Sequence, residues 1–171
     1  MNKNNSNVTH LSQQEKNEKQ IISLLLNNSP YFSKSDLIVN QSMVVTESFV
    51  PSYEKIQSRH AELLKSTYIN WLQINKESYF IQYLFEESWL SNSISRDKSD
   101  ALIEDYEQRW TIHHTFSRVG FSYDGRQALI YWCMWCPGGL PQCGTIYLFE
   151  LTQKQWYKKW QQKGYFGVFN Q

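Results

Sequence analysis

Residues 116–160 read FSRVGFSYDGRQALIYWCMWCPGGLPQCGTIYLFELTQKQWYKKW, and this stretch decides the fold class. Apolar and polar positions alternate along it, and turn residues interrupt the alternation, which is typical of consecutive antiparallel strands. All three Cys of the chain lie in it, so any thiol site belongs to this sheet. We predict four strands, over residues 116–123, 126–135, 144–151 and 156–160.

The pair Asp124-Gly125 marks the turn between the first two strands. An Asp-Gly pair between apolar runs favours a two-residue type I′ turn, because both central residues of that turn need positive φ. The second strand, residues 126–135, is apolar on both faces, which indicates a central strand that is covered on both sides. The last strand carries Lys158 and Lys159, which favour an edge position because charged side chains discourage further pairing.

Two motifs of this stretch, S-R-V-G-F at residues 117–121 and Q-A-L-I-Y at residues 127–131, precede a loop with Cys and Gly and a final strand with Trp. In this order they resemble a group of small uncharacterised bacterial proteins that share S-R-V-G-F, A-L-V/I-Y and C-G in a C-terminal antiparallel sheet. The resemblance covers the last third of the chain well and the first half loosely, and the loop here is longer and richer in Pro. It implies one domain and a bacterial source, and it implies no activity.

The residues before this sheet predict helices and one further strand. Ser12 and Glu15 have the spacing of a capping box, at the start of a helix that ends near Leu26. Apolar residues at spacings of three and four predict the longest helix, which begins after Pro51. We predict a strand over residues 37–45 and helices over residues 53–75, 79–90 and 99–110, of which 79–90 can also be a buried strand.

This order of elements predicts the α+β class, with helices packed on one face of a four- to five-stranded, mostly antiparallel curved sheet. By analogy at the level of fold alone, it is similar to cystatin-like and NTF2-like domains, which include both enzymes and binding proteins. A chain of 171 residues is long enough for one domain with a core. We expect a disordered polar tail over residues 1–12 and a single domain over residues 13–171.

Charge and hydropathy exclude some partners. Lys and Arg number 17 and Asp and Glu number 16, which argues against nucleic acid because phosphate binding needs a basic surplus. No apolar run approaches the length of a membrane span, and no secretory signal precedes the first helix. We therefore expect a cytoplasmic protein that does not bind membranes.

The three thiols have the pattern C-x2-C-x6-C, over Cys133, Cys136 and Cys143, around a loop with two Pro and two Gly. They can bind zinc if His113 or His114 supplies a fourth ligand, because structural zinc takes four Cys or His ligands. Alternatively, a disulfide between Cys136 and Cys143 closes the loop. The third interpretation, packed or solvated thiols, suits a reducing cytoplasm. We favour the third and keep zinc as the alternative cofactor.

Arg118 is the candidate for a charged binding residue, because a guanidinium group can bind a carboxylate or phosphate through two parallel hydrogen bonds. It falls on the strand face opposite Val119 and Phe121. If that face lines a cavity, Arg118 binds a ligand there. Otherwise Arg118 pairs with an acid such as Glu150, which we favour.

No phosphate loop, dinucleotide fingerprint or nucleophile elbow occurs in the chain. Aromatic residues make up 16% of it, and they either pack the sheet against helices or form a surface for a ligand or partner. We therefore predict a non-enzymatic binding or protein-interaction domain that holds a protein partner or small ligand on the sheet or on the loop over residues 136–143. Its predicted binding residues are Arg118, Trp135 and Leu140, and we predict no catalytic residues. The alternative is a small metal-binding protein, or an enzyme, with a pocket around Arg118.

Overall fold

The computed structural model describes residues 11–28, 30, 32–33, 35–48, 50–105, 111–135 and 143–164. Its helices are α1 (Gln13–Asn28), α2 (Tyr53–Gln57), α3 (Lys65–Ile74), the 3-10 helix η1 (Gln82–Leu84), α4 (Glu87–Leu90) and α5 (Arg96–Glu104). Its strands are β1 (Leu37–Val39), β2 (Ser93–Ile94), β3 (His113–Phe116), β4 (Gly120–Phe121), β5 (Gln127–Trp135), β6 (Cys143–Thr152) and β7 (Gln155–Gly164). The predicted tail lies outside the described residues, apart from its last two, and so does the predicted helix beyond residue 105.

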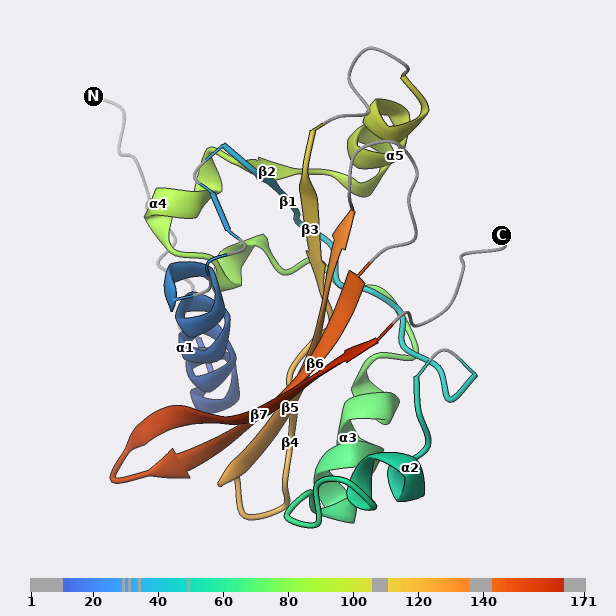
Figure 1. Ribbon diagram of the computed structural model, residues 1–171. Coiled ribbons are helices and arrows are strands. Elements are labelled where there is room, and N and C mark those ends of the chain that lie inside the picture. The colour runs from blue at the N-terminus through green and yellow to red at the C-terminus, as the bar shows by residue number, and fades with distance from the viewer. Residues whose placement is uncertain are drawn as a thin grey trace, which may run out of the picture.

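The strands form one mixed sheet in the order β2-β1-β3-β5-β6-β7, with β4 also paired to β5 (Figure 1). Every pairing among β3 to β7 is antiparallel, whereas β1 pairs in parallel with both β2 and β3. The α+β class and the mostly antiparallel sheet are therefore confirmed. The predicted count of four to five strands is wrong, because β2 has only two residues and shows no periodicity, and because two short strands, β3 and β4, replace the one predicted over residues 116–123.

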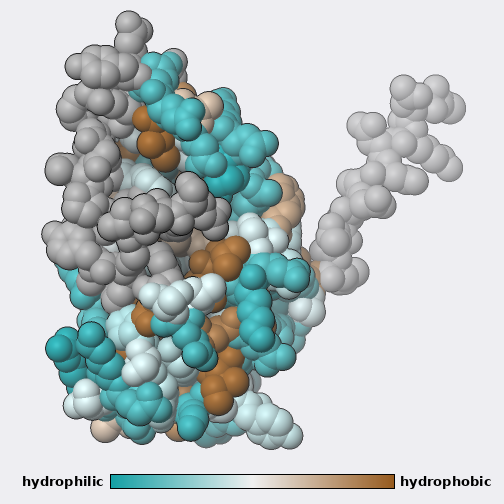
Figure 2. All heavy atoms as spheres, turned by 90° about the vertical axis from the view of Figure 1, so that its right-hand side faces the viewer, coloured by the Kyte–Doolittle hydropathy of each residue, from teal (hydrophilic) through white to brown (hydrophobic). Residues whose placement is uncertain are grey.

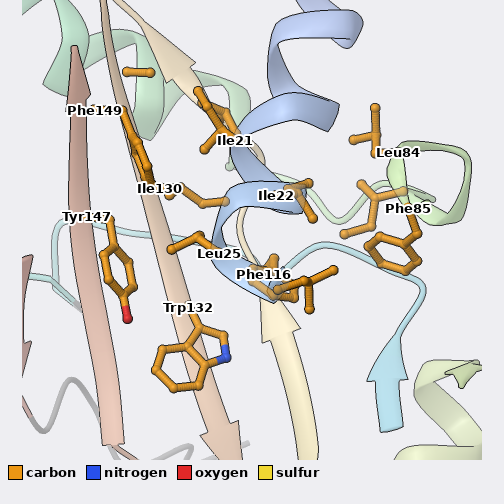
Figure 3. Close-up of a cluster of buried hydrophobic side chains, with 14 of the residues drawn as sticks. Ile21, Ile22, Leu25, Leu84, Phe85, Phe116, Ile130, Trp132, Tyr147 and Phe149 are labelled. Atoms are coloured by element: carbon orange, nitrogen blue, oxygen red, sulfur yellow. The ribbon is translucent and has the colours of Figure 1, made fainter. Parts of the chain in front are cut away.

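Helices cover both faces of the sheet, so the prediction that they pack on one face is wrong (Figure 1). On one face, Ile21, Ile22 and Leu25 of α1 pack between the strands and the η1 segment (Figure 3). On the other face, α2 and α3 bury Ile56 and Trp71 against β5 and β6. Each cluster excludes apolar surface from water, which is the main stabilising contribution to such a core.

Strand β5 explains why two helical layers are needed. Ala128, Ile130 and Trp132 belong to the cluster beneath α1. Leu129, Tyr131 and Cys133 belong to the cluster beneath α3. Since successive side chains of a strand point to opposite faces, a strand that is apolar at every position has to be covered twice. The prediction of a central, doubly covered strand is confirmed.

The predicted helix over residues 53–75 is interrupted between α2 and α3, and the side chain of Gln127 shows why. Its buried Oε1 atom accepts hydrogen bonds from the Leu64 amide at 2.8 Å and the Thr67 hydroxyl at 2.9 Å. Its Nε2 atom donates to the Glu62 carbonyl at 2.9 Å. The bonds to the Leu64 amide and the Glu62 carbonyl satisfy backbone groups that a continuous helix would bond internally, so α3 begins at Lys65.

Three other expected elements differ from their predictions. The strand predicted over residues 37–45 ends at Val39 as β1, and only an isolated bridge joins Gln41 to Phe80 further on. The helix predicted over residues 79–90 forms only as η1 and α4. Helix α5 begins at Arg96, because its cap is Ser95 and not Ser99 or Asp100 as predicted. In contrast, the Ser12–Glu15 capping box of α1 forms as predicted.

Two hairpin turns do not adopt the conformations that their sequences favour. At Asp124-Gly125 only Gly125 has positive φ, at 67°, so the turn is present but is not the predicted type I′ turn. The β6–β7 turn has positive φ at both Gln153 (52°) and Lys154 (66°), as type I′ requires. The β6–β7 turn therefore holds two non-glycine residues in the left-handed region, where side chains are strained.

Replacing Gln153-Lys154 by Asn-Gly is expected to raise the free energy of unfolding by about 1–2 kcal/mol. The left-handed conformation costs about 1–2 kcal/mol for an ordinary residue, and Asn-Gly is the preferred pair in this turn. Urea unfolding measures the change. The control replaces both residues by Ala, which removes the same side chains without relieving the strain. The free energy of unfolding of this control should be equal to that of the wild type or lower. An Asn-Gly variant no more stable than the wild type would contradict the prediction.

A bulge in β7 lets this strand bury one Trp on each face of the sheet. The register shifts between Leu148 and Phe149, which pair with Trp160 and Lys158, so Lys159 is the extra residue. Trp156 consequently joins the α1 cluster, whereas Trp160 joins the α3 cluster. Without the bulge, residues four apart would share a face.

Candidate functional site

Arg118 forms an ion pair inside the protein. Its guanidinium group donates to both carboxylate oxygens of Glu18 on α1, at 2.6 and 2.7 Å. The Glu18 side chain is fully buried, and its Oε1 atom also accepts a hydrogen bond from the Val119 amide at 2.9 Å. Glu150, the partner predicted for Arg118, instead has a carboxylate oxygen 3.3 Å from the ammonium nitrogen of Lys159. Arg118 also follows β3 rather than lying within a strand, and its role in ligand binding stays a prediction.

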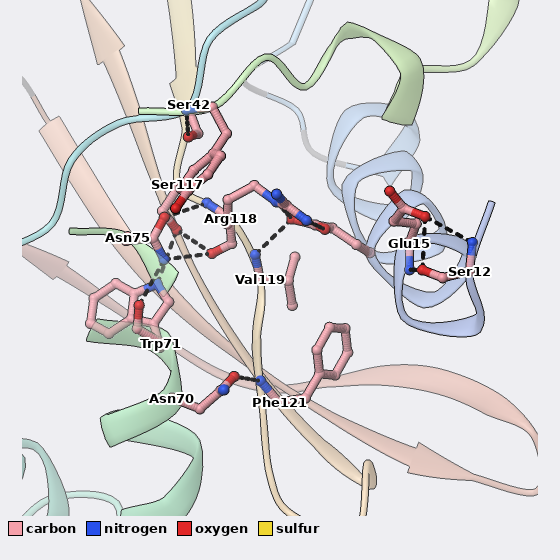
Figure 4. Close-up of polar contacts among 12 residues, drawn as sticks. Ser12, Glu15, Ser42, Asn70, Trp71, Asn75, Ser117, Arg118, Val119 and Phe121 are labelled. Carbon is pink, nitrogen blue, oxygen red and sulfur yellow. Dashed lines mark hydrogen bonds and ion pairs between the residues drawn. The ribbon is translucent and has the colours of Figure 1, made fainter. Parts of the chain in front are cut away.

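The segment over residues 117–121, which carries the S-R-V-G-F motif, connects both helical layers to the sheet (Figure 4). Towards α1 it uses the Arg118–Glu18 pair. Towards α3, Ser117 accepts a hydrogen bond from the Trp71 indole at 3.0 Å, and the Phe121 amide donates to Asn70 at 2.8 Å. These contacts give the motif a structural role.

The two adjacent histidines lie on opposite faces of β3. His113 is on the face of Cys133, and its Nδ1 atom shares a hydrogen bond of 2.8 Å with the Ser99 hydroxyl. His114 lies on the α1 face, where Nε2 is 2.9 Å from Asp36 and Nδ1 accepts from the Trp132 indole at 3.1 Å. Because the indole can only donate, Nδ1 carries no proton and His114 is neutral. The two rings therefore cannot serve one metal ion together.

Burial lowers the pKa of both His113 and His114 from the usual 6.5, although Asp36 opposes the shift at His114. As the pH falls below about 6.5, the unfolded chain takes up protons at these residues that the folded chain does not. We expect the free energy of unfolding to fall between pH 7.5 and 5.5, by at most about 1.4 kcal/mol per pH unit for each His. Urea unfolding at several pH values measures the slope. The slope of the free energy of unfolding against pH should be smaller in His114→Gln than in the wild type. An unchanged slope would contradict the prediction.

The predicted thiol site is only partly within the described residues. Cys133 is buried in the α3 cluster, opposite Thr115 and not opposite His113. Cys136, Leu140 and the side chain of Cys143 lie outside the described residues, and so does the rest of the predicted binding loop. Trp135 is partly buried at the end of β5. Among the described residues, no three His, Cys, Asp or Glu side chains come together as a metal site would need.

The face that carries α2 and α3 has a shallow cleft of about 540 Å³ beside Tyr53, Tyr68 and Ile69. Hydrophobic side chains on this face are separated by hydrophilic ones (Figure 2). Two Glu and two Lys line the cleft, so its charges balance. Burial, with Glu47 and Glu54 nearby, raises the pKa of Tyr68 to about 12, so its hydroxyl stays neutral and donates to the Pro51 carbonyl. The charges that line the cleft therefore do not indicate a charged ligand.

A second depression, which we call the aromatic groove, lies between the end of α1 and strands β6 and β7. Its volume is about 420 Å³. The residues that line it are Leu24, Leu25, Asn28, Pro30, Tyr147, Phe149, Trp156, Tyr157, Lys158 and Gln161. Tyr147, Phe149 and Trp156 are mostly buried in the core, so they form a fixed floor. Tyr157 is half exposed at the rim.

Lys158 is the single charged residue among the described residues that line the aromatic groove. Its ammonium group lies 6.0 Å from the centre of the Tyr147 ring and donates to the Gln161 amide oxygen at 3.0 Å. Neighbouring Lys159, in contrast, is neutralised by Glu150. Sequence reasoning identified the aromatic and basic residues of β7 but could not place them against α1. The arrangement suits a ligand that joins an apolar group to an acidic one.

Comparison with known proteins found no family model, no curated protein and no solved structure that matches this chain. Among the described residues, no helix is both long and apolar enough to cross a membrane.

Proposed function

We propose that this chain is a non-enzymatic binding domain and that the aromatic groove is where it holds a protein partner. The observation that carries the proposal is Lys158, a cation at the rim of an aromatic floor with no carboxylate partner in the described part of the chain. Aromatic side chains are common anchors of protein interfaces, because they bury a large area with little loss of side-chain freedom. The partner would place an apolar side chain on the floor and a carboxylate at Lys158.

The other polar clusters do not favour catalysis. Arg118 is held by Glu18, and both ring nitrogens of His114 are bonded. His113 lies across the sheet from them. A general acid or base has to reach a substrate through a hydrogen bond or one water molecule. Arg118 and His114 are turned towards other protein groups, and His113 is buried. The prediction that the loop over residues 136–143 binds a partner, and the resemblance to small bacterial proteins, remain predictions.

A library of random twelve-residue peptides displayed on phage, selected on the full chain, tests the proposal. We expect the selected peptides to carry Asp or Glu beside an aromatic or aliphatic residue. Fluorescence anisotropy then compares a labelled peptide on the wild type, on Lys158→Glu and on Lys55→Glu, which reverses an exposed charge on α2. We expect at least tenfold weaker binding for Lys158→Glu and no change for Lys55→Glu. An empty selection, or peptides that bind both variants as the wild type, would overturn the proposal.

A further inference from the structure

Strand β7 is an open sheet edge along the rim of the aromatic groove. It has ten residues, and in the described part of the chain it is the last strand of the sheet (Figure 1). An edge strand presents a row of backbone N–H and C=O groups that another extended chain can pair with. Peptides are recognised in this way when an edge lies beside pockets for alternate side chains.

The register of the β6–β7 hairpin identifies which backbone groups face outwards. Thr152 and Gln155 lie opposite each other across the two-residue turn, as a hydrogen-bonded pair. Hydrogen-bonded and non-hydrogen-bonded pairs alternate along an antiparallel ladder. The backbone groups of Trp156 and Lys158, opposite Leu151 and Phe149, therefore point away from β6 and towards the open edge.

The side chains of these same two residues line the aromatic groove. A strand that paired with the backbone of Trp156 and Lys158 would hold its opposing side chains on the groove face of the sheet, because directly opposite residues share a face. One peptide segment could thus satisfy the open edge and fill the groove together.

Charge selects the partner. Strand β7, residues 155–164, contains three Lys and no Asp or Glu, and Lys159 is the one that pairs with Glu150. Two copies of β7 would therefore repel each other on pairing, since like charges on neighbouring strands are destabilising. An acidic segment would instead be attracted. The Lys residues thus oppose self-pairing and at the same time favour one class of partner.

We infer that the partner of the proposed binding domain is an extended acidic segment of another protein, which adds a strand to β7 opposite Trp156 and Lys158. This inference rests on the proposed function, because it uses the aromatic groove as the side-chain pocket. It adds that the partner's backbone, and not only its side chains, forms the contact.

Backbone methylation of a peptide selected as above tests strand addition apart from groove binding. In an extended peptide, every second amide faces the same way. Two versions of the peptide are therefore made. One is N-methylated at every second amide, and the other is N-methylated at the remaining amides. We expect one version to bind at least tenfold more weakly and the other nearly as well as the parent. We also expect the amides of Trp156 and Lys158 to exchange hydrogen more slowly when the parent peptide is bound.

A matched pair of variants tests the same contact from the protein side. Lys158→Ala and Lys158→Pro both remove the charge, but only Pro removes the outward N–H, and Pro is tolerated where an edge N–H faces solvent. We expect Lys158→Pro to bind the peptide at least tenfold more weakly than Lys158→Ala. Equal binding by both methylated peptides, with sensitivity to Lys158→Glu retained, would overturn strand addition and leave groove binding standing. The absence of any peptide binding would overturn both.

Discussion

The Glu18→Ala variant is expected to lose about 3–5 kcal/mol of unfolding free energy, which is the usual effect of breaking a buried ion pair from one side. The carboxylate of Glu18 is fully buried and accepts from Arg118 and from the Val119 amide. Its removal leaves the Arg118 charge and a buried N–H without their partner, and both then lack compensation for lost hydration. Chemical denaturation by urea measures the loss.

A double variant separates the ion pair from simple packing. In Glu18→Gln with Arg118→Met no charge is left unpaired, and the Gln amide oxygen can still accept from the Val119 amide. We expect it to be more stable than Glu18→Ala by about 2 kcal/mol or more, because replacing a whole buried pair is often nearly neutral. Lys16→Ala, on the exposed side of α1, serves as the control and should change stability by less than about 0.5 kcal/mol. A Glu18→Ala variant as stable as this control would show that the pair contributes nothing.

The Gly120→Ala variant is expected to lose about 3 kcal/mol or more, at the upper end of the range for overpacked sites. A Cβ atom at residue 120 would overlap the Cα and Cβ atoms of Trp71 on α3. Backbone atoms of a packed helix cannot rotate away as the end of a side chain can, so α3 has to move from the sheet. Near-ultraviolet circular dichroism should show the loss of the fixed Trp71 environment, and urea unfolding should show the loss of stability.

The Gly125→Ala variant is the matched control, because it tests conformation without crowding. Gly125 has a positive φ of 67°, and nothing lies within 4 Å of the position of an added Cβ. We expect a loss of about 1–2 kcal/mol from backbone strain alone. If Gly120→Ala were no more destabilising than Gly125→Ala, the close approach of α3 to β4 would not be the reason for glycine at residue 120.

Local pattern was sufficient for the elements whose stabilising contacts are close in sequence. The Ser12–Glu15 capping box, the turn at Asp124-Gly125 and the doubly apolar strand β5 could all be predicted, because each depends on residues within one turn or one strand. The interruption of the predicted helix at residues 58–64 could not be predicted from local pattern. The group that causes it, the side chain of Gln127, lies about sixty residues further along the chain.

The candidate site was predictable only in its composition. The aromatic and basic residues of the last strands were visible in the sequence, and so was the open edge marked by Lys158 and Lys159. Their meeting with Leu24 and Leu25 of α1 was not visible, because nothing local relates residues more than a hundred positions apart. The same holds for Arg118, whose partner proved to be Glu18 and not Glu150.

The sequence by itself determined the α+β class, the antiparallel order of the last strands, the central place of β5 and the capping box of α1. These features follow from side-chain periodicity and backbone preferences, which act between near neighbours. Only the tertiary structure decided that helices cover both faces, that a bulge sends Trp156 and Trp160 to opposite faces, and that residues 117–121 connect α1 and α3 to the sheet. The physical reason is that buried polar groups and close backbone contacts are satisfied by whichever partners the packed chain brings within reach.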